Sequence, residues 1–227
     1  MAQRRPVGAG ACRCSVGAAD VCERAGYVQA MTLHRTVASA FRATHQTLAF
    51  AEQGAAQFLK RGTEAEFGLH TAVTNGRAVT FVLQNLTSND LLGSPFLTWY
   101  DREMTQMRAD PIDRWFVELR NRIEKQGTMG ARTGTFISNY SSSTVEPDRP
   151  IGATSRFLGD HMGRAGWKIA LPDGSTTVVY TATPPYMRTV MTTLGAPDDF
   201  DVFKHLEPWL AKLRDLVERA EAEWGMK

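Results

Sequence analysis

The segment DPIDRWFVELRNRIEKQG (Asp110–Gly127) carries the clearest signal of secondary structure in this chain. Asp110 is a residue type that caps helix N-termini, and Pro111 fits the first helical position because its missing N–H needs no partner there. The apolar residues then recur at helical spacing and form one stripe: Ile112, Phe116, Leu119 and Ile123. Gly127 follows as a typical helix terminator. We therefore predict an amphipathic helix over residues 111–126.

Polar residues flank the apolar stripe of this helix. Arg120 and Glu124 share one face, and Asn121 and Lys125 share the neighbouring face. One interpretation is a solvated helix surface, because oppositely charged pairs at this spacing stabilise a helix by only about 0.2–0.5 kcal/mol each. The pairs concerned are Arg120–Glu124 and Glu118–Arg122. The alternative is a site or seam that a second helix or subunit covers.

Helical periodicity extends upstream over residues 33–126. Apolar residues at steps of three and four predict a first helix that ends near Leu59, and Gly62 follows it. Thr63 is the expected N-cap of a second helix. Pro95 is expected in the first turn of a third, before the helix at 111–126.

The pattern changes after Gly127. Alternation in GWKIALPDGSTTVVYTA (166–182), with a Pro-Asp-Gly turn, predicts a β-hairpin that packs on the helices or pairs with a strand near Phe136. Residues 146–166 lack periodicity and are expected to be loop. The amphipathic segment 201–227 predicts a closing helix. The fold class is therefore α+β, mainly α: a helical bundle over residues 31–130, then a loop, a β-hairpin and a C-terminal helix over residues 131–227.

Residues 1–30 differ from the remainder in composition. They hold all three cysteines, Cys12, Cys14 and Cys22, and their Gly- and Ala-rich sequence predicts a disordered extension, so that Met31 is a candidate initiator. Four arginines and two acidic residues there account for the formal charge of +2, which leaves residues 31–227 neutral. A protein that grips long nucleic acid through phosphates usually carries a basic excess. No apolar run approaches the roughly 18 residues that a membrane helix needs.

Histidine spacing predicts no metal site, because none of the five histidines forms a paired helical motif. His45 and His70 fall on predicted helices, where they are expected to face each other as ordinary bundle residues. His161 lies in the glycine-bearing loop, a kind of segment that often carries function. No cofactor is expected.

The run PFLTWYDREMTQMRADPIDRWFVELRNRIEKQG (95–127) resembles the HEPN superfamily, named for higher eukaryote and prokaryote nucleotide binding. The features concerned are an aromatic helix, an Asp-Pro start, aromatic core residues and an Arg-Asn pair: Trp99-Tyr100, Asp110-Pro111, Trp115-Phe116 and Arg120-Asn121. The resemblance covers about residues 33–130 and implies a HEPN-like antiparallel helical bundle.

Active members of that superfamily are metal-independent ribonucleases in which two copies of an Arg-Asn-x-x-x-His motif converge. The resemblance assigns Arg120 and Asn121 to phosphate binding, but Lys125 stands where the family has histidine. A lysine with an ordinary pKa near ~10.4 is a poor base at neutral pH. The expected catalytic set is the degenerate Arg120, Asn121 and Lys125, and the expected ligand-binding set is Arg120, Asn121 and Glu124.

Three functional hypotheses follow. The first is a non-catalytic or impaired HEPN-like module, homodimeric through residues 111–126, that binds RNA or another phosphate-bearing ligand such as a nucleotide. Its expected setting is the cytoplasm, in bacterial defence or a toxin–antitoxin system. The second is an active metal-independent ribonuclease, with Lys125 or a histidine outside the motif completing the site. The third is a helical interaction scaffold without a ligand site. Whether the chain is an enzyme is open in the sequence, which favours a non-catalytic protein.

Overall fold

The computed structural model describes residues 36–138 and 149–225. They belong to one compact unit that begins at Thr36. The predicted extension at residues 1–30, the three cysteines and Met31 lie outside the described residues, and the proposed boundary near residue 130 stays a prediction.

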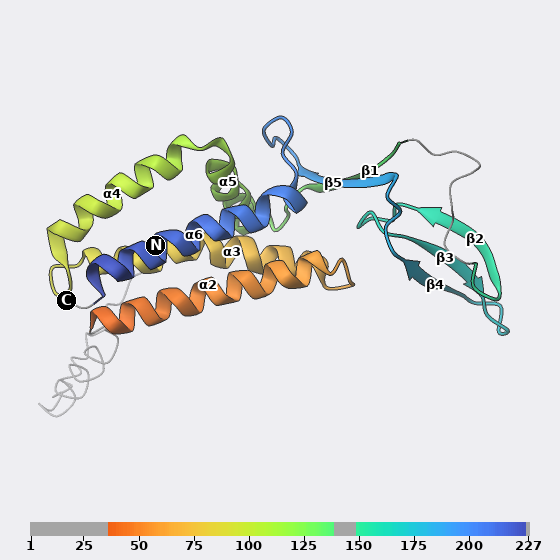
Figure 1. Ribbon diagram of the computed structural model, residues 1–227, viewed down its shortest axis with the longest axis horizontal. Coiled ribbons are helices and arrows are strands. Elements are labelled where there is room, and N and C mark those ends of the chain that lie inside the picture. Colours follow the sequence, from red (N-terminus) through yellow and green to blue (C-terminus); the bar gives the residue numbers. More distant parts are fainter. Residues whose placement is uncertain (1–35, 139–148, 226–227) are drawn as a thin grey trace, which may run out of the picture. The chain divides into compact units, whose positions relative to one another are not determined.

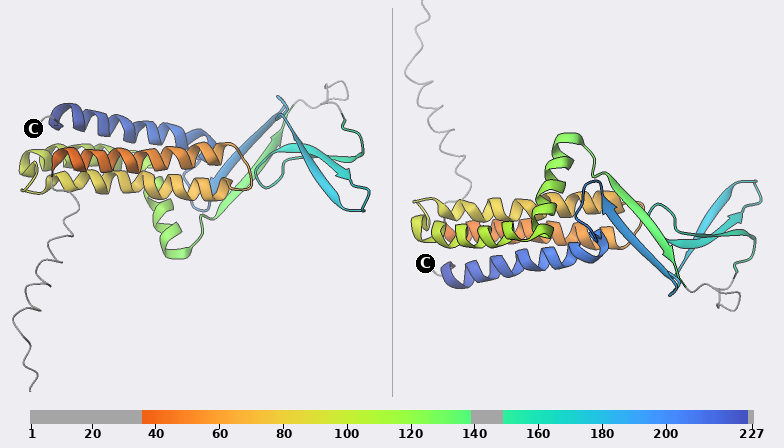
Figure 2. Two further views of the ribbon diagram at one scale, coloured as in Figure 1. Left: turned by 90° about the horizontal axis from the view of Figure 1, so that it is seen from below. Right: turned by 90° about the horizontal axis from the view of Figure 1, so that it is seen from above.

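Helices make up most of the described chain, as expected from the sequence. Figure 1 shows α2 running antiparallel to α3 and α6, and the two views in Figure 2 show α5 crossing these helices rather than lying along them. The helices are α2 (Val37–Leu59), α3 (Ala65–Gln84), the short 3₁₀ helix η1 (Asn85–Thr87), α4 (Gly93–Ala109), α5 (Pro111–Gln126) and α6 (Val202–Trp224). The prediction of a mainly helical α+β protein with a closing C-terminal helix is confirmed.

Local capping signals set the ends of α5 as predicted. The Asp110 carboxylate accepts from the N–H groups of Ile112 and Asp113, and Gly127 ends the helix in the left-handed conformation. The prediction for α3 is wrong: Glu64, not Thr63, is the N-cap, and its side chain makes no capping hydrogen bond. Because this helix end lacks a side-chain cap, packing against α2 explains its position better than the local sequence does.

Two glycines allow α2 and α3 to pack with their backbones in contact. A Cβ atom added to Gly54 of α2 would lie 2.6 Å from the Ala72 nitrogen, and one added to Gly68 of α3 would lie 2.6 Å from the Phe58 nitrogen. Backbone atoms cannot turn aside as side chains do, so these positions tolerate only glycine at this helix separation. The sequence pattern gave no indication of this contact.

Two apolar clusters form the core of the bundle. The larger joins α2, α3, α5 and α6 and includes the stacked rings of Phe116 and Trp209, whose centroids are 4.2 Å apart. The smaller lies toward α4, where the Phe96 ring packs edge-on against Trp224 of α6. The predicted stripe of α5 is buried here: Phe116, Leu119 and Ile123 all belong to the larger cluster.

The β region is larger than the predicted hairpin. Its hairpin is confirmed as β3 (Ala165–Ala170) and β4 (Thr176–Thr181), but β3 also pairs with β2 (Ala153–Leu158), which lies in the segment expected to be loop. The strand near Phe136 is present as β1 (Ala131–Ile137), yet it pairs with β5 (Met187–Thr193) and not with the hairpin. All pairings are antiparallel. The inward residues of β5 alternate as Met187, Thr189, Met191 and Thr193, and this mixed apolar and polar pattern explains why the strand was missed.

Specific contacts connect the β1–β5 ribbon to the helices. The Trp115 indole N–H donates to the Thr193 hydroxyl over 2.9 Å, and Met191 belongs to the larger core cluster. No helix in the described part of the chain is both long and apolar enough to span a membrane.

Candidate functional site

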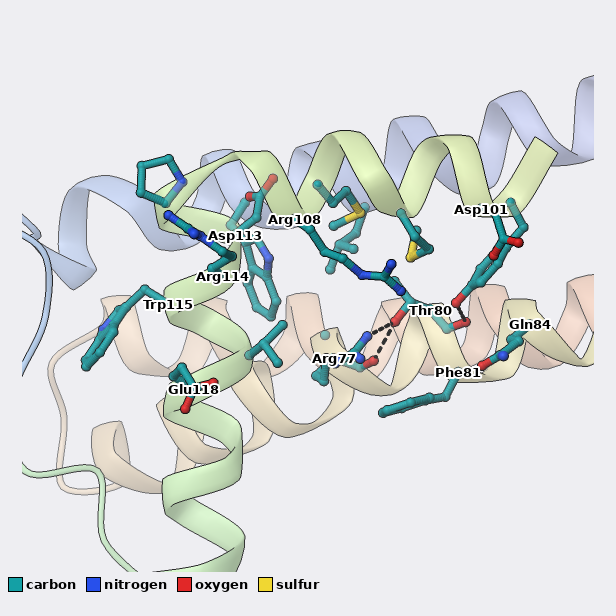
Figure 3. A pocket seen from close by; sticks show the side chains of 18 of the residues that line it. Arg77, Thr80, Phe81, Gln84, Asp101, Arg108, Asp113, Arg114, Trp115 and Glu118 are labelled. Atoms are coloured by element: carbon teal, nitrogen blue, oxygen red, sulfur yellow. Dashed lines mark hydrogen bonds between the residues drawn. The ribbon is translucent and has the colours of Figure 1, made fainter. Parts of the chain in front are cut away.

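A pocket of about 580 Å³ opens between α3, α4, α5 and α6. Figure 3 shows its lining side chains, which come from all four helices and from the segment before α6. Its apolar wall consists of Met104, Met107, Trp115, Trp209 and Leu213. A pocket of this size, largely apolar with a few polar groups, is typical of small-ligand sites.

Arg77 of α3 is the central polar group of this pocket. Its guanidinium is half-buried, donates to the Thr80 hydroxyl and lies 4.1 Å from the centroid of the Phe81 ring. Burial is the main cause that lowers the pKa of Arg77, because a charged group loses hydration there. The side chain still carries its charge at neutral pH, since arginine starts from a very high pKa.

Two further arginines reach the same place from other helices. The positive charges of Arg120 on α5 and Arg108 on α4 also lower the pKa of Arg77. Arg108 extends from α4 toward the Arg77–Thr80 pair (Figure 3), and among the described residues it forms no ion pair. Arg120 is paired with Glu124, so Arg77 and Arg108 are the two positive charges at this place whose mutual repulsion a bound anion offsets.

Carboxylates also line the pocket. Asp101 and Glu118 are exposed at its edge. Asp113 is buried and already paired, since the Lys212 ammonium lies 3.2 Å from it and 2.5 Å from Asp110. Burial raises the pKa of Asp113, whereas the hydrogen bond from Lys212 lowers the pKa of Asp110. The Asp113 carboxylate is therefore paired with Lys212 of α6 and does not neutralise the arginines.

The predicted motif residues separate into two groups in the structure. Arg120 is half-buried, pairs with Glu124 over 2.5 Å as the helical spacing predicted, and its guanidinium carbon lies 5.8 Å from the Phe81 ring centroid. Asn121 is half-buried beside it and accepts from Arg120 over 3.4 Å. Lys125 is exposed in the last turn of α5. The structure thus places Arg120 beside the pocket wall, while Asn121, Glu124 and Lys125 are not among its lining residues.

Arg122, which follows Asn121 in the sequence, contacts the segment after β5. Arg122 donates to the Leu194 carbonyl oxygen and lies over the Trp115 ring at 5.3 Å, so it ties α5 to the segment after β5. The predicted Glu118–Arg122 ion pair does not form within the described part of the chain. Only one of the two predicted charged pairs of α5 is present.

The histidines are arranged differently from the expectation. His45 does not face His70: its Nε2 lies 2.7 Å from a Glu221 carboxylate oxygen on α6. His70 and His161 instead line a second pocket of about 680 Å³, next to the linker between α5 and β1. Only tertiary structure brings these two together, since they are far apart in the sequence. Among residues 36–138 and 149–225, no group of three or more potential ligands is placed to hold a metal ion.

The fold and the pocket define a mainly helical α+β protein with arginines at a pocket between four helices. Residues 34–142 are similar to a known family, that of bacteriophage lambda protein ea47. The matched segment contains α2 to α5 and β1, whereas α6 and the three-stranded sheet lie beyond it. No curated protein and no solved structure matches the chain. The HEPN resemblance therefore stays a prediction.

Proposed function

We propose that this chain is a non-catalytic, HEPN-like module that binds a phosphate-bearing ligand of nucleotide size. The observation that carries the proposal is that Arg77 and Arg108, from two helices, line one pocket, with the charge of Arg108 unpaired among the described residues and Arg120 beside the pocket wall. Guanidinium groups bind phosphate oxygens through paired N–H donors, and such charge-assisted hydrogen bonds are stronger than neutral ones.

The apolar part of the pocket favours an organic phosphate over a bare anion. Phe81 is 44% exposed beside Arg77, and a planar base can stack on an exposed ring or guanidinium. Met104 and Met107 offer adaptable apolar surface on the opposite helix. A nucleoside phosphate combines the anion and the planar ring that these two parts accept.

A non-catalytic role agrees with the residues at hand. The described side chains that line the pocket include neither histidine nor cysteine, the residue types that most readily exchange protons near neutrality. Lys125 occupies the position of the family histidine and does not line the pocket. We extend the proposal to a cytoplasmic protein of a bacterial defence or toxin–antitoxin system, a setting that the HEPN resemblance implies.

Calorimetric titration with ATP, with adenosine as the phosphate-free control, tests this proposal. The wild type is expected to bind ATP and to bind adenosine much more weakly. Arg77→Ala and Arg108→Ala are each expected to weaken ATP binding roughly 10-fold or more, since a charge-assisted hydrogen bond contributes about 1.5–3 kcal/mol. Arg42→Ala, an exposed arginine on α2, is the matched control and leaves binding unchanged. Absence of ATP binding by the wild type, or equal loss in all three variants, would contradict the proposal.

Ribonuclease activity is a second candidate, because the Arg120–Asn121 pair that the HEPN resemblance assigns to phosphate binding is kept together in the structure, with Asn121 accepting from Arg120 over 3.4 Å. End-labelled RNA incubated with the protein in EDTA distinguishes this candidate from the first. Cutting that is lost in Arg120→Ala would establish the ribonuclease. Cutting that appears only in Lys125→His would show that the site is impaired at that position.

A further inference from the structure

The arginine pocket carries polar side chains at matching intervals on two of its helices. On α3, Arg77 and Gln84 are seven residues apart, with Phe81 between them. On α4, Asp101 and Arg108 are also seven residues apart. Seven residues make two helical turns, or about 10.5 Å, so each set lies along one face of its helix. Because the chain reverses direction between α3 and α4, the two arginines lie toward the same end of the pocket (Figure 1).

A hydrogen bond between the two helices separates the two ends of this array. The Tyr100 hydroxyl of α4 donates to the Thr80 carbonyl oxygen of α3 over 3.0 Å. Figure 3 shows Asp101 and Gln84 on one side of this hydrogen bond and the two arginines on the other. The pocket therefore has a cationic end and an end that presents a carboxylate and an amide.

The carboxylate and the amide are available to a ligand. Asp101 and Gln84 are exposed, and among the described residues Asp101 forms no ion pair. A carboxylate repels phosphate, so Asp101 suits a part of the ligand that donates hydrogen bonds. The exposed ring of Phe81 lies between this end and Arg77, where a planar base can stack.

The acceptor and donor groups at this end match one base. An ionised carboxylate only accepts hydrogen bonds, whereas a glutamine amide both donates and accepts. Guanine presents two adjacent donors on its Watson–Crick edge, the N1–H and the 2-amino group, next to the O6 acceptor. Adenine presents one donor there, beside the N1 lone pair, which repels a carboxylate oxygen. Uracil and cytosine likewise lack two adjacent donors at this edge.

We propose that the pocket selects guanine nucleotides. The Asp101 carboxylate accepts from N1–H and the 2-amino group, and the Gln84 amide donates to O6. The base stacks on Phe81, and the phosphates bind Arg77 and Arg108. This inference rests on the proposed nucleotide site and names the ligand of that site.

Calorimetric titration of the full chain with GTP, ATP and xanthosine triphosphate tests the selection. The wild type is expected to bind GTP about 10- to 100-fold more tightly than ATP, because a bidentate base contact discriminates by that factor. Asp101→Asn is expected to lose this preference while its affinity for ATP stays the same. Xanthine carries a carbonyl in place of the 2-amino group, so asparagine, with one acceptor and one donor, fits it. Asp101→Asn is therefore expected to bind xanthosine triphosphate more tightly than the wild type does, a gain that misfolding cannot produce.

A second carboxylate supplies the matched comparison. Glu118 lies at the opposite end of the pocket (Figure 3), and Glu118→Gln is expected to keep the preference for GTP over ATP. Equal affinity of the wild type for GTP and ATP would overturn the guanine assignment and leave the nucleotide site standing. Binding of neither nucleotide would overturn both. Loss of the preference in Glu118→Gln but not in Asp101→Asn would overturn the assignment of Asp101 to the base.

Discussion

The helical bundle and the three-stranded sheet differ in how much apolar surface each buries within the chain. In the bundle every helix contributes to one of two extended core clusters, and the ligand pocket lies between four of these helices. The main buried cluster near the sheet consists of only Ala165, Tyr186 and Met187, with Leu158 packed against it. The bundle is therefore expected to determine stability and ligand binding, while the sheet is expected to tolerate substitution with little loss of stability.

The largest difference should appear when one apolar side chain is removed from each region. Phe116 is fully buried and stacks on Trp209, so Phe116→Ala is expected to lower the free energy of unfolding by about 3–5 kcal/mol. Val179 of β4 is 41% exposed, so Val179→Ala should lower the free energy of unfolding by less than ~1 kcal/mol. Urea titrations measure both. Similar losses in the two variants would contradict the comparison.

A single methyl group tests how tightly the bundle is packed. A Cβ atom at Gly76 would lie 2.5 Å from the Trp209 ring, so Gly76→Ala forces that ring from its place against Phe116 and is expected to cost about 1–3 kcal/mol. Gly62, in the turn between α2 and α3, has no atom within 4 Å of such a Cβ. Gly62→Ala is the matched control and should be neutral or slightly stabilising. Thermal unfolding of both variants measures the difference.

The Lys212 contact with Asp110 and Asp113 gives the bundle a pH dependence. Lys212→Met removes the cation, leaves the buried Asp113 carboxylate beside Asp110, and is expected to cost about 1–2 kcal/mol near pH 7. The pKa of Asp110 is lowered mainly by Lys212, so its contribution is present above its unfolded pKa and is lost as the pH falls through the folded value. The pKa of Asp113 rises further without the cation.

The deficit of Lys212→Met should therefore shrink as the pH falls from about 7 into the range below about 4. Asp113, whose pKa is raised, takes up its proton first, and Asp110, whose pKa is lowered, takes up its proton only below its ordinary value of 3.8. Denaturant unfolding of the wild type and the variant across this range measures it. Lys204→Met, on the same helix but with no ion pair among the described residues, should show no such trend. A deficit that is constant with pH would show that the three groups are not coupled.

Local sequence signals predicted the helices more successfully than the sheet. The Asp110-Pro111 start and the Gly127 end of α5 were predictable because capping depends on residues close in the sequence. β2 lies in a segment without periodicity, and its pairing with β3 depends on tertiary contacts. The close contact of α2 and α3 at their glycines could not be predicted from the local sequence either, because it depends on the separation of two helices.

The candidate site was only partly predictable for the same reason. Arg120 was identified from its neighbour Asn121 and from the family resemblance. Arg77 and Arg108 belong to no recognisable sequence motif, and only the packing of α3, α4 and α5 brings them near Arg120. Likewise, no local pattern links His70 with His161.

The most direct test of the proposed ligand site uses the methionine methyl groups, which are distributed over both pockets. Met104 and Met107 line the arginine pocket, whereas Met129, Met162 and Met191 line the pocket that contains His70 and His161. In protein labelled with ¹³C at the methionine methyl groups, titration with ATP is predicted to shift the Met104 and Met107 signals and leave the other three in place. Shifts confined to Met129, Met162 and Met191, or no shift at saturating ATP, would contradict binding at the arginine cluster.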